Sequence, residues 1–292
     1  MQKTLDLSIK LHETKSLDGG YIIDNKPPYQ AYMDNNKWDD FIYDMKINHN
    51  DTFNEYGAGS GGETKPSACF PPKMASYGSS SRFIYNLCKD VPDFHFEHKL
   101  PTKVGGIANL DGFIEKDDRY IFIEAKCREP YGTKNNLIEN KYSELYDYIT
   151  KSSCNLNIDT INVGTKMDVT FSVNGRKINH FDIKQMICHL LGMAVKFLNT
   201  PTQKKIDFVY LCYNPNLISI IDEKKKASII STYSTMCDEC NSIDFKTLFK
   251  VIVTYLNMKL NVGSATQDEI SKMIFEFSFE LCDQNNFVNK LN

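Results

Sequence analysis

The sequence of 292 residues lacks the long apolar segments that mark membrane proteins and secreted precursors. No stretch approaches the roughly 18 consecutive apolar residues that a membrane-spanning helix needs. The first residues, Met1–Asp6, contain no apolar core of a signal peptide. The chain also has nine cysteines, which without a secretion signal are typical of a reducing compartment. These features predict a cytoplasmic protein with no membrane contact.

The sequence also lacks repeats, an excess of basic residues and the composition of a disordered chain. Aromatic residues make up 12% of it and the net charge is only -3, so a folded globular protein is expected. The length suits one large domain with insertions or two intimate domains. Because phosphate neutralisation dominates indiscriminate nucleic-acid coating, the weakly acidic balance disfavours that role. Any contact with nucleic acid would require a local basic patch.

Two short patterns suggest binding sites but do not complete them. Gly57 and Gly62 have the spacing of a phosphate-binding loop, but the next residue is Glu63 where such a loop has lysine. A carboxylate there would repel a nucleotide, so we expect a flexible loop, with Glu63 presented to an active site as the alternative. Cys237 and Cys240 lack the second pair of ligands that zinc requires, which favours helical surface thiols.

The order of predicted elements is the most informative feature of the sequence. Apolar residues recur at helical spacing from Asp34 to Ile47, and Ser79–Ser81 can cap a helix that ends before Pro92. Three strand-like segments follow, at Phe94–Leu100, Leu110–Lys116 and Arg119–Lys126. The polar residues 127–180 include a predicted helix from Leu137 to Ile149. A strong helix from Asp182 to Leu198 then precedes a buried strand at Ile206–Tyr213.

The C-terminal part has weaker signals. A helix begins near Glu223, the apolar run Leu248–Leu256 suits a strand or a helix, and Thr266 with Glu269 matches the capping box of a final helix. Together the patterns predict an α/β fold with a central mixed sheet. We divide the chain into an N-terminal arm with a helical addition (1–76), a core (77–214, with an insertion at 127–180) and a C-terminal addition packed on the core (215–292).

Asp111 and Glu124 are the strongest candidates for a functional site. If Asp117-Asp118 close a hairpin, Asp111 lies directly opposite Glu124, and Lys126 shares their face. Facing carboxylates repel each other unless a cation lies between them, and a hard divalent ion with oxygen ligands resolves that conflict. Lys126 can then orient a water or neutralise charge on a phosphoryl group. The alternative is a solvated charged face, which the aromatic residues on this face disfavour.

Asp111 and Glu124-x-Lys126, with a helix and a strand before them and a helix and a strand after them, resemble the PD-(D/E)xK nuclease superfamily. The resemblance covers about residues 77–214. It implies the restriction-endonuclease-like α-β-β-β-α-β core and a DNA endonuclease that uses Mg²⁺, or Mn²⁺ as a substitute, held by Asp111 and Glu124 and assisted by Lys126. Leu110 replaces the proline of the pattern, and the helix after Ser79 lacks a glutamate that many members have. Glu63 or Glu97 could replace that carboxylate.

Other residues near this segment are candidates for substrate contacts. Gln185 and His189 lie one turn apart at the edge of the apolar stripe of their helix, where they could touch substrate or be polar groups satisfied inside the core. Arg82 and Arg128 are candidate substrate-binding residues within a basic group. That group also contains Lys99, Lys103, Lys126, Lys134 and Lys141. Together these side chains could form a basic cleft.

The expected function is therefore a Mg²⁺-dependent DNA endonuclease, a restriction or defence enzyme being one option. Two alternatives stay open: a non-catalytic nucleic-acid-binding module on the same fold, and a metal-dependent RNA phosphodiesterase. The residues Asp111, Glu124 and Lys126 favour catalysis over the binding module. The sequence leaves the oligomeric state open, a homodimer included.

Overall fold

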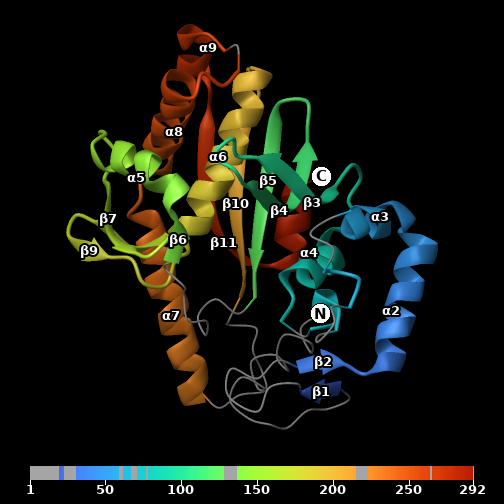
Figure 1. Ribbon diagram of the computed structural model, residues 1–292. Coiled ribbons are helices and arrows are strands. Elements are labelled where there is room, and N and C mark those ends of the chain that lie inside the picture. Colours follow the sequence, from blue (N-terminus) through green and yellow to red (C-terminus); the bar gives the residue numbers. More distant parts are fainter. Residues whose placement is uncertain are drawn as a thin grey trace.

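The computed structural model describes residues 20–22, 31–58, 62–66, 71–76, 78–127, 137–214, 223–263 and 265–291. A five-stranded sheet with helices on both faces forms its centre, and a smaller four-stranded sheet lies beside it (Figure 1). The fold is α/β with a central mixed sheet, as predicted. None of the helices within these ranges is both long enough and apolar enough to cross a bilayer.

The central sheet joins both parts of the predicted core. From one edge to the other it runs β11 (Phe275–Cys282), β10 (Lys205–Tyr213), β5 (Arg119–Lys126), β4 (Ile107–Glu115) and β3 (His95–Pro101). β3, β4 and β5 pair antiparallel, whereas β5, β10 and β11 pair parallel. The strand predicted at Ile206–Tyr213 therefore joins the hairpin's sheet, and coverage of both faces of the sheet by helices accounts for its nearly continuous burial.

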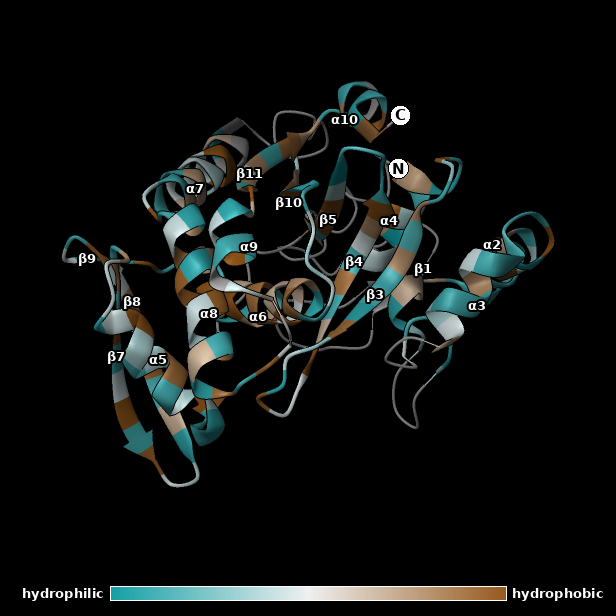
Figure 2. Cartoon of the chain, turned by 90° about the horizontal axis from the view of Figure 1, so that it is seen from above, coloured by the Kyte–Doolittle hydropathy of each residue, from teal (hydrophilic) through white to brown (hydrophobic). Residues whose placement is uncertain are grey.

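Helices cover both faces of this sheet. Viewed from above, α6 (Ile183–Asn199) and α8 (Phe245–Lys259) lie on one side, and α4 (Ser80–Cys88) and α10 (Gln284–Leu291) lie on the other (Figure 2). The predicted N-cap of α4 is confirmed, because the Ser79 side chain accepts a hydrogen bond from the backbone of that helix. α6 precedes β10 and is the crossover helix that the parallel pairing of β5 with β10 requires.

The described part of the insertion between β5 and α6 forms a small sheet with one short α-helix. Its elements are β6 (Leu137–Glu139), the 3₁₀ helix η3 (Asn140–Tyr142), α5 (Ser143–Thr150), β7 (Leu156–Val163), β8 (Lys166–Val173) and β9 (Arg176–Lys177). The helix predicted from Leu137 was wrong in its first half, where Leu137–Glu139 pair with β8. The hairpin of β7 and β8 turns at Gly164, which has a φ of 62°.

The C-terminal part contributes the strand β11 to the central sheet, whereas the described strands of the N-terminal part, β1 and β2, form a separate two-stranded sheet. The N-terminal part contains β1 (Gly20–Ile22), β2 (Ala31–Met33), α2 (Asn35–Asn48), α3 (Asn50–Ala58) and the 3₁₀ helix η1 (Lys73–Ala75). Most of the predicted N-terminal arm lies outside the described residues. The C-terminal part contains α7 (Glu223–Asn241), α8, α9 (Gln267–Lys272), β11 and α10. The capping box at Thr266 is confirmed, but β11 was not predicted, although its residues alternate apolar and polar.

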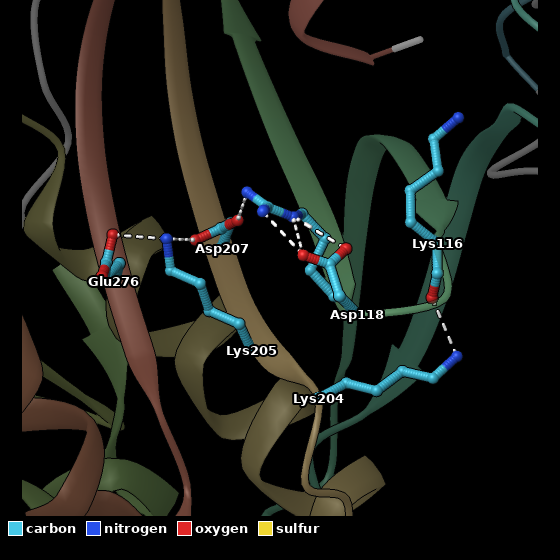
Figure 3. A network of polar contacts seen from close by, with 7 residues as sticks. Lys116, Asp118, Lys204, Lys205, Asp207 and Glu276 are labelled. Carbon is cyan, nitrogen blue, oxygen red and sulfur yellow. Dashed lines mark hydrogen bonds and ion pairs between the residues drawn. The ribbon is translucent and has the colours of Figure 1, made fainter.

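A row of charged side chains ties the beginnings of β5, β10 and β11 together (Figure 3). Asp207 lies 3.3 Å from Nη1 of Arg119 and 3.0 Å from Nζ of Lys205, which in turn lies 2.6 Å from Glu276. These partly exposed pairs contribute little free energy each, about 1 kcal/mol or less. Opposite charges are therefore matched across the neighbouring strands β5, β10 and β11.

Gly192 allows α6 to lie unusually close to the sheet. A Cβ atom at this position would lie 2.7 Å from the Cβ of Leu100 and 3.0 Å from the Cβ of Ala108. We therefore expect Gly192→Ala to destabilise the protein by about 1–3 kcal/mol in urea unfolding, despite the better helix propensity of alanine. Gly57→Ala in α3 is the control, because nothing lies within 4 Å of its added Cβ. Equal stability of the two variants would contradict this packing argument.

Candidate functional site

The candidate site lies where β4 and β5 separate. These strands pair in the predicted register, with Gly112 opposite Ile123, but the backbone pairing does not continue to Asp111 and Glu124. Instead, Oδ2 of Asp111 accepts a hydrogen bond of 2.7 Å from the backbone N–H of Ala125. The prediction that Asp111 and Glu124 lie on adjacent antiparallel strands is confirmed. The separation of the strands opens the sheet beside both carboxylates.

Polar side chains from β5 and α6 surround the carboxylate of Glu124. Its Oε1 lies 2.6 Å from Nζ of Lys126 and accepts a hydrogen bond of 2.7 Å from Nε2 of Gln185. Oε1 of Gln185 accepts a hydrogen bond of 2.7 Å from the same Nζ. On the other side, Nε2 of His189 lies 3.1 Å from Oε2 of Glu124. The Gln185 amide therefore bridges the Glu124 carboxylate and the Lys126 ammonium group, and positions both.

The two carboxylates have opposite electrostatic environments. Burial alone would raise the pKa of Glu124, but Lys126 and His189 outweigh it and lower that pKa to about 2. Burial raises the pKa of Asp111 well above its usual value, and the nearby charge of Glu124 raises it further. Glu124 is therefore the permanent anion of the pair. Additional positive charge beside Asp111 would favour its ionised form.

A pocket of about 500 Å³ adjoins this pair, and we call it the carboxylate pocket. Its charged lining consists of Glu63, Glu97, Asp111, Glu124, Lys73 and Lys126. Glu63 is buried and lies 2.8 Å from Nζ of Lys73. The pocket has two more carboxylates than lysines among its lining residues, so its field favours a cation.

Glu97 enters this pocket from β3 through a local distortion of the strand. Its φ of 52° lies in the left-handed region, which is uncommon for a residue with a side chain. The β3–β4 pairing skips this position, between Phe96 opposite Gly112 and His98 opposite Leu110. Oε1 of Glu97 accepts a hydrogen bond of 3.1 Å from the hydroxyl of Ser81. Both residues considered as an additional carboxylate, Glu63 and Glu97, therefore lie at the site.

The donor chemistry of the pocket fits a divalent cation such as Mg²⁺. Mg²⁺ is commonly held by one or two carboxylates, with water and substrate oxygens completing its octahedron. Asp111 and Glu124 supply two such groups. Because burial and the charge of Glu124 raise the pKa of Asp111, a nearby cation would stabilise the ionised form of this carboxylate. Among the described residues, no group of three or more histidine, cysteine, aspartate or glutamate side chains is arranged to hold a metal by itself.

Glu97 should make the stability of the metal-free protein depend on pH. Burial, followed by repulsion from Glu63, raises its pKa from 4.5 to about 7. Because the folded pKa exceeds the unfolded one, the stability that this group contributes is complete below pH 4.5 and is lost as the pH rises through 7. In EDTA, Glu97→Gln should therefore raise the melting temperature at pH 8 and change it little at pH 5.

The control for this melting experiment is Glu144→Gln, which removes an exposed carboxylate of α5. It should shift the melting temperature similarly at both pH values. A gain for Glu97→Gln that is the same at pH 5 and pH 8 would contradict the electrostatic account of this residue.

Among the residues that the structure describes, Arg82, Lys99, Lys103 and Lys141 of the predicted basic group do not line the carboxylate pocket. Arg82 is only 2% exposed, and its Nη1 lies 3.5 Å from the Ala75 carbonyl oxygen, so its side chain lies inside the fold; its predicted role in substrate binding stays a prediction. Lys99 and Lys141 donate hydrogen bonds to backbone carbonyls, at Ala58 and Gly105 respectively, away from the carboxylate pocket. Arg128, like Lys134, lies outside the described residues.

Sequence reasoning missed two groups at the site. Ser80 places its hydroxyl 3.4 Å from Oδ1 of Asp111, and Lys73 pairs with Glu63. Ser80 follows the N-cap of α4, so the position of that cap relative to Asp111 depends on helix packing rather than on any sequence pattern. Lys73 had no spacing signal at all. No family model, curated protein or solved structure matches this chain.

Proposed function

We propose that this protein hydrolyses nucleic-acid phosphodiester bonds with a divalent cation, Mg²⁺ or Mn²⁺, held by Asp111 and Glu124. The observation that carries the proposal is the convergence of Asp111, Glu124 and Lys126 on one pocket, beside the point where β4 and β5 stop pairing. The cation would polarise a phosphoryl oxygen and lower the pKa of a bound water. DNA is the expected substrate, following the resemblance of this arrangement to the PD-(D/E)xK superfamily.

The residues of this chain have separable roles in the proposed reaction. Asp111 and Glu124 supply negative oxygen ligands, and Glu124 stays ionised because Lys126 and His189 lower its pKa. Lys126 presents a positive charge next to the position of a bound phosphate or water, where it can stabilise charge that develops in the transition state. Gln185 is a positioning residue, because it holds Lys126 and Glu124 together.

The order of elements supports the finer fold assignment within this proposal. α4, β3, β4, β5, α6 and β10 follow the α-β-β-β-α-β order of a restriction-endonuclease-like core. The antiparallel β3–β4–β5 meander and the parallel β10 place the ends of β5 and β10 at the same edge of the sheet. Function does not follow from fold alone, so the proposal depends on the residues of the site.

One observation favours a second candidate, a nucleic-acid-binding module without catalysis. The Glu124 carboxylate is already neutralised by Lys126 and contacted by Gln185 and His189. In a binding module this cluster would be a buried structural network with no need for a metal. Such a network would retain its stability in the presence of a chelator.

A cleavage assay separates these candidates. Supercoiled plasmid, single-stranded DNA and single-stranded RNA are incubated with the full chain in Mg²⁺, Mn²⁺ or EDTA. The proposal predicts cleavage of DNA that requires either metal and stops in EDTA. Cleavage of RNA alone would support the phosphodiesterase alternative. Binding of nucleic acid without cleavage in either metal would support the binding module and would overturn the proposed hydrolysis.

A further inference from the structure

The loop that leads into α6 is held by a carboxylate from the C-terminal part of the chain. Oε1 of Glu239, near the end of α7, accepts a hydrogen bond of 2.8 Å from the backbone N–H of Asn179. Its Oε2 accepts two more, of 2.8 Å from His180 N–H and of 2.9 Å from Phe181 N–H. Successive backbone N–H groups that converge on one anion form a binding nest. We call residues 179–181 the nest.

The nest is joined directly to the residue that bridges the candidate site. It ends at the residue before Asp182, the N-cap of α6, whose Oδ1 accepts a hydrogen bond of 3.0 Å from Gln185 N–H. The side chain of Gln185 in turn contacts both Glu124 and Lys126. A short series of hydrogen bonds and backbone therefore connects Glu239 with the carboxylate pocket.

The position of Glu239 is unfavourable for α7 itself. This helix extends over Glu223–Asn241, so Glu239 lies in its last turn, where the negative end of the helix dipole repels a carboxylate. Alanine also has the higher helix propensity. Both effects predict that alanine at position 239 would stabilise α7, whereas the loss of three charge-assisted hydrogen bonds predicts the opposite. The sign of the change in stability therefore separates the two roles.

The packing of α7 gives the contact with the nest a fixed origin. Buried residues recur at helical spacing along this helix, namely Ile229, Tyr233, Met236 and Cys240. The chain just after α7 is also tied to the small sheet, because Nδ2 of Asn155 donates a hydrogen bond of 2.8 Å to the carbonyl oxygen of Ser242. α7 and the small sheet lie on the same side of the molecule (Figure 1). Glu239 is therefore presented to the nest by a packed element.

We propose that Glu239 is a positioning residue of the candidate site. By holding the nest it fixes the start of α6, and thereby the Gln185 side chain against Glu124 and Lys126. The expected effect on cleavage rests on the proposed function, whereas the expected effect on Gln185 does not. The inference gives the C-terminal part a role in the site, although none of its described side chains lines the carboxylate pocket.

The test replaces Glu239 with alanine in the full chain and then supplies the missing carboxylate. Glu239→Ala removes the CH₂–COO⁻ end of the side chain, which leaves a space of the shape of an acetate ion. In EDTA the variant should melt about 4 °C or more below wild type. Sodium acetate should recover most of this loss, and sodium chloride of the same ionic strength should not. Glu239→Gln keeps one acceptor oxygen, so its melting temperature should fall between those of wild type and Glu239→Ala.

A spectroscopic readout reports on Gln185 itself. In protein labelled with ¹⁵N-glutamine, the side-chain amide signal of Gln185 is assigned by its loss in Gln185→Ala. This signal should shift in Glu239→Ala and return toward its wild-type position in acetate. A contribution of Glu239 to the stability of α7 alone would leave the signal in place.

The rate of cleavage is the third readout. The single-turnover rate of metal-dependent DNA cleavage should fall at least about tenfold in Glu239→Ala, because small displacements of groups that position the reactants are costly. Acetate should restore this rate as well, and it should leave the rate of wild type unchanged relative to chloride.

The matched control is Asp238→Ala, which removes the adjacent, exposed carboxylate of α7. It should neither lower the melting temperature nor shift the Gln185 signal, and it should respond equally to acetate and chloride. Equal effects of Asp238→Ala and Glu239→Ala would overturn the inference. So would a Gln185 signal that stays unchanged in Glu239→Ala, or a recovery in acetate that chloride reproduces.

These outcomes are separable from that of the proposed hydrolysis. If wild type cleaves no nucleic acid while acetate restores the melting temperature and the Gln185 signal of Glu239→Ala, the inference stands and the proposed hydrolysis is wrong. If wild type cleaves DNA with Mg²⁺ and Glu239→Ala cleaves at the same rate with an unchanged Gln185 signal, the inference is wrong and the proposed function stands.

Discussion

Lys126→Ala should lower the rate of metal-dependent cleavage by about 10²–10³-fold while the protein retains or increases its affinity for Mn²⁺. The lysine stabilises charge on the reacting phosphate or water, so its loss reduces the chemical step. Its Nζ also lies 2.6 Å from Oε1 of Glu124, and removing that positive charge leaves the carboxylate more attractive to a cation. Single-turnover plasmid nicking measures the rate, and calorimetric titration with Mn²⁺ measures the affinity.

The matched comparison is Lys73→Ala, which removes the other lysine of the carboxylate pocket. Lys73 pairs with Glu63 and not with Glu124, so we expect less than about a tenfold loss of rate. Cleavage by Lys126→Ala at the wild-type rate would show that the proposed mechanism is wrong. A loss of Mn²⁺ binding in this variant would indicate that Lys126 has a structural role instead.

Asp111→Asn should abolish metal binding and yet stabilise the metal-free protein above neutral pH. Burial raises the pKa of Asp111, so its ionised form is unfavourable in the folded state, and a neutral amide removes that cost. The amide oxygen can still accept the hydrogen bond from Ala125 N–H. In EDTA at pH 8 the melting temperature should therefore rise by a few degrees, because about 1 kcal/mol corresponds to roughly 2–4 °C at this size.

Addition of Mn²⁺ should reverse the order of stability. At a concentration about 100 times its Kd, the ion stabilises wild type by about 2.7 kcal/mol, whereas Asp111→Asn gains little. Asp147→Asn, an exposed change on α5, is the control and should follow wild type in both conditions. A wild-type melting temperature that does not respond to Mn²⁺ or Mg²⁺ would argue against a metal site and in favour of the binding module.

The elements that the sequence predicted correctly are those whose signals are local. The register of the hairpin follows from the Asp117-Asp118 turn and from alternation on both strands, and it places Gly112 opposite Ile123. The N-cap at Ser79 and the capping box at Thr266 are short patterns with a direct physical cause. α6 and β10 are strongly periodic or continuously apolar, so their types were also predictable.

The elements that the sequence did not predict are strands whose alternation of apolar and polar residues is weak or follows a helix signal. β11 alternates phenylalanine with polar residues from Phe275 onward, but the capping box at Thr266 predicted a final helix and no strand after it. β7 alternates weakly because most of its residues are exposed, and its strand state depends on pairing with β8. The basic cleft was predicted from nearness in the sequence. That nearness says nothing about burial, and Arg82 proved to be inside the fold.

The sequence by itself determined the α/β class, the pairing of β4 with β5 and the identity of Asp111, Glu124 and Lys126 as the candidate site, because turn residues and side-chain period act over a few residues. Only the tertiary structure decided that Gln185 bridges Lys126 and Glu124, and that Glu63 and Glu97 enter the same pocket. These contacts join segments that are far apart in the chain. They depend on how α6 and the N-terminal part pack against the central sheet, and packing of this kind leaves no periodic trace in the sequence.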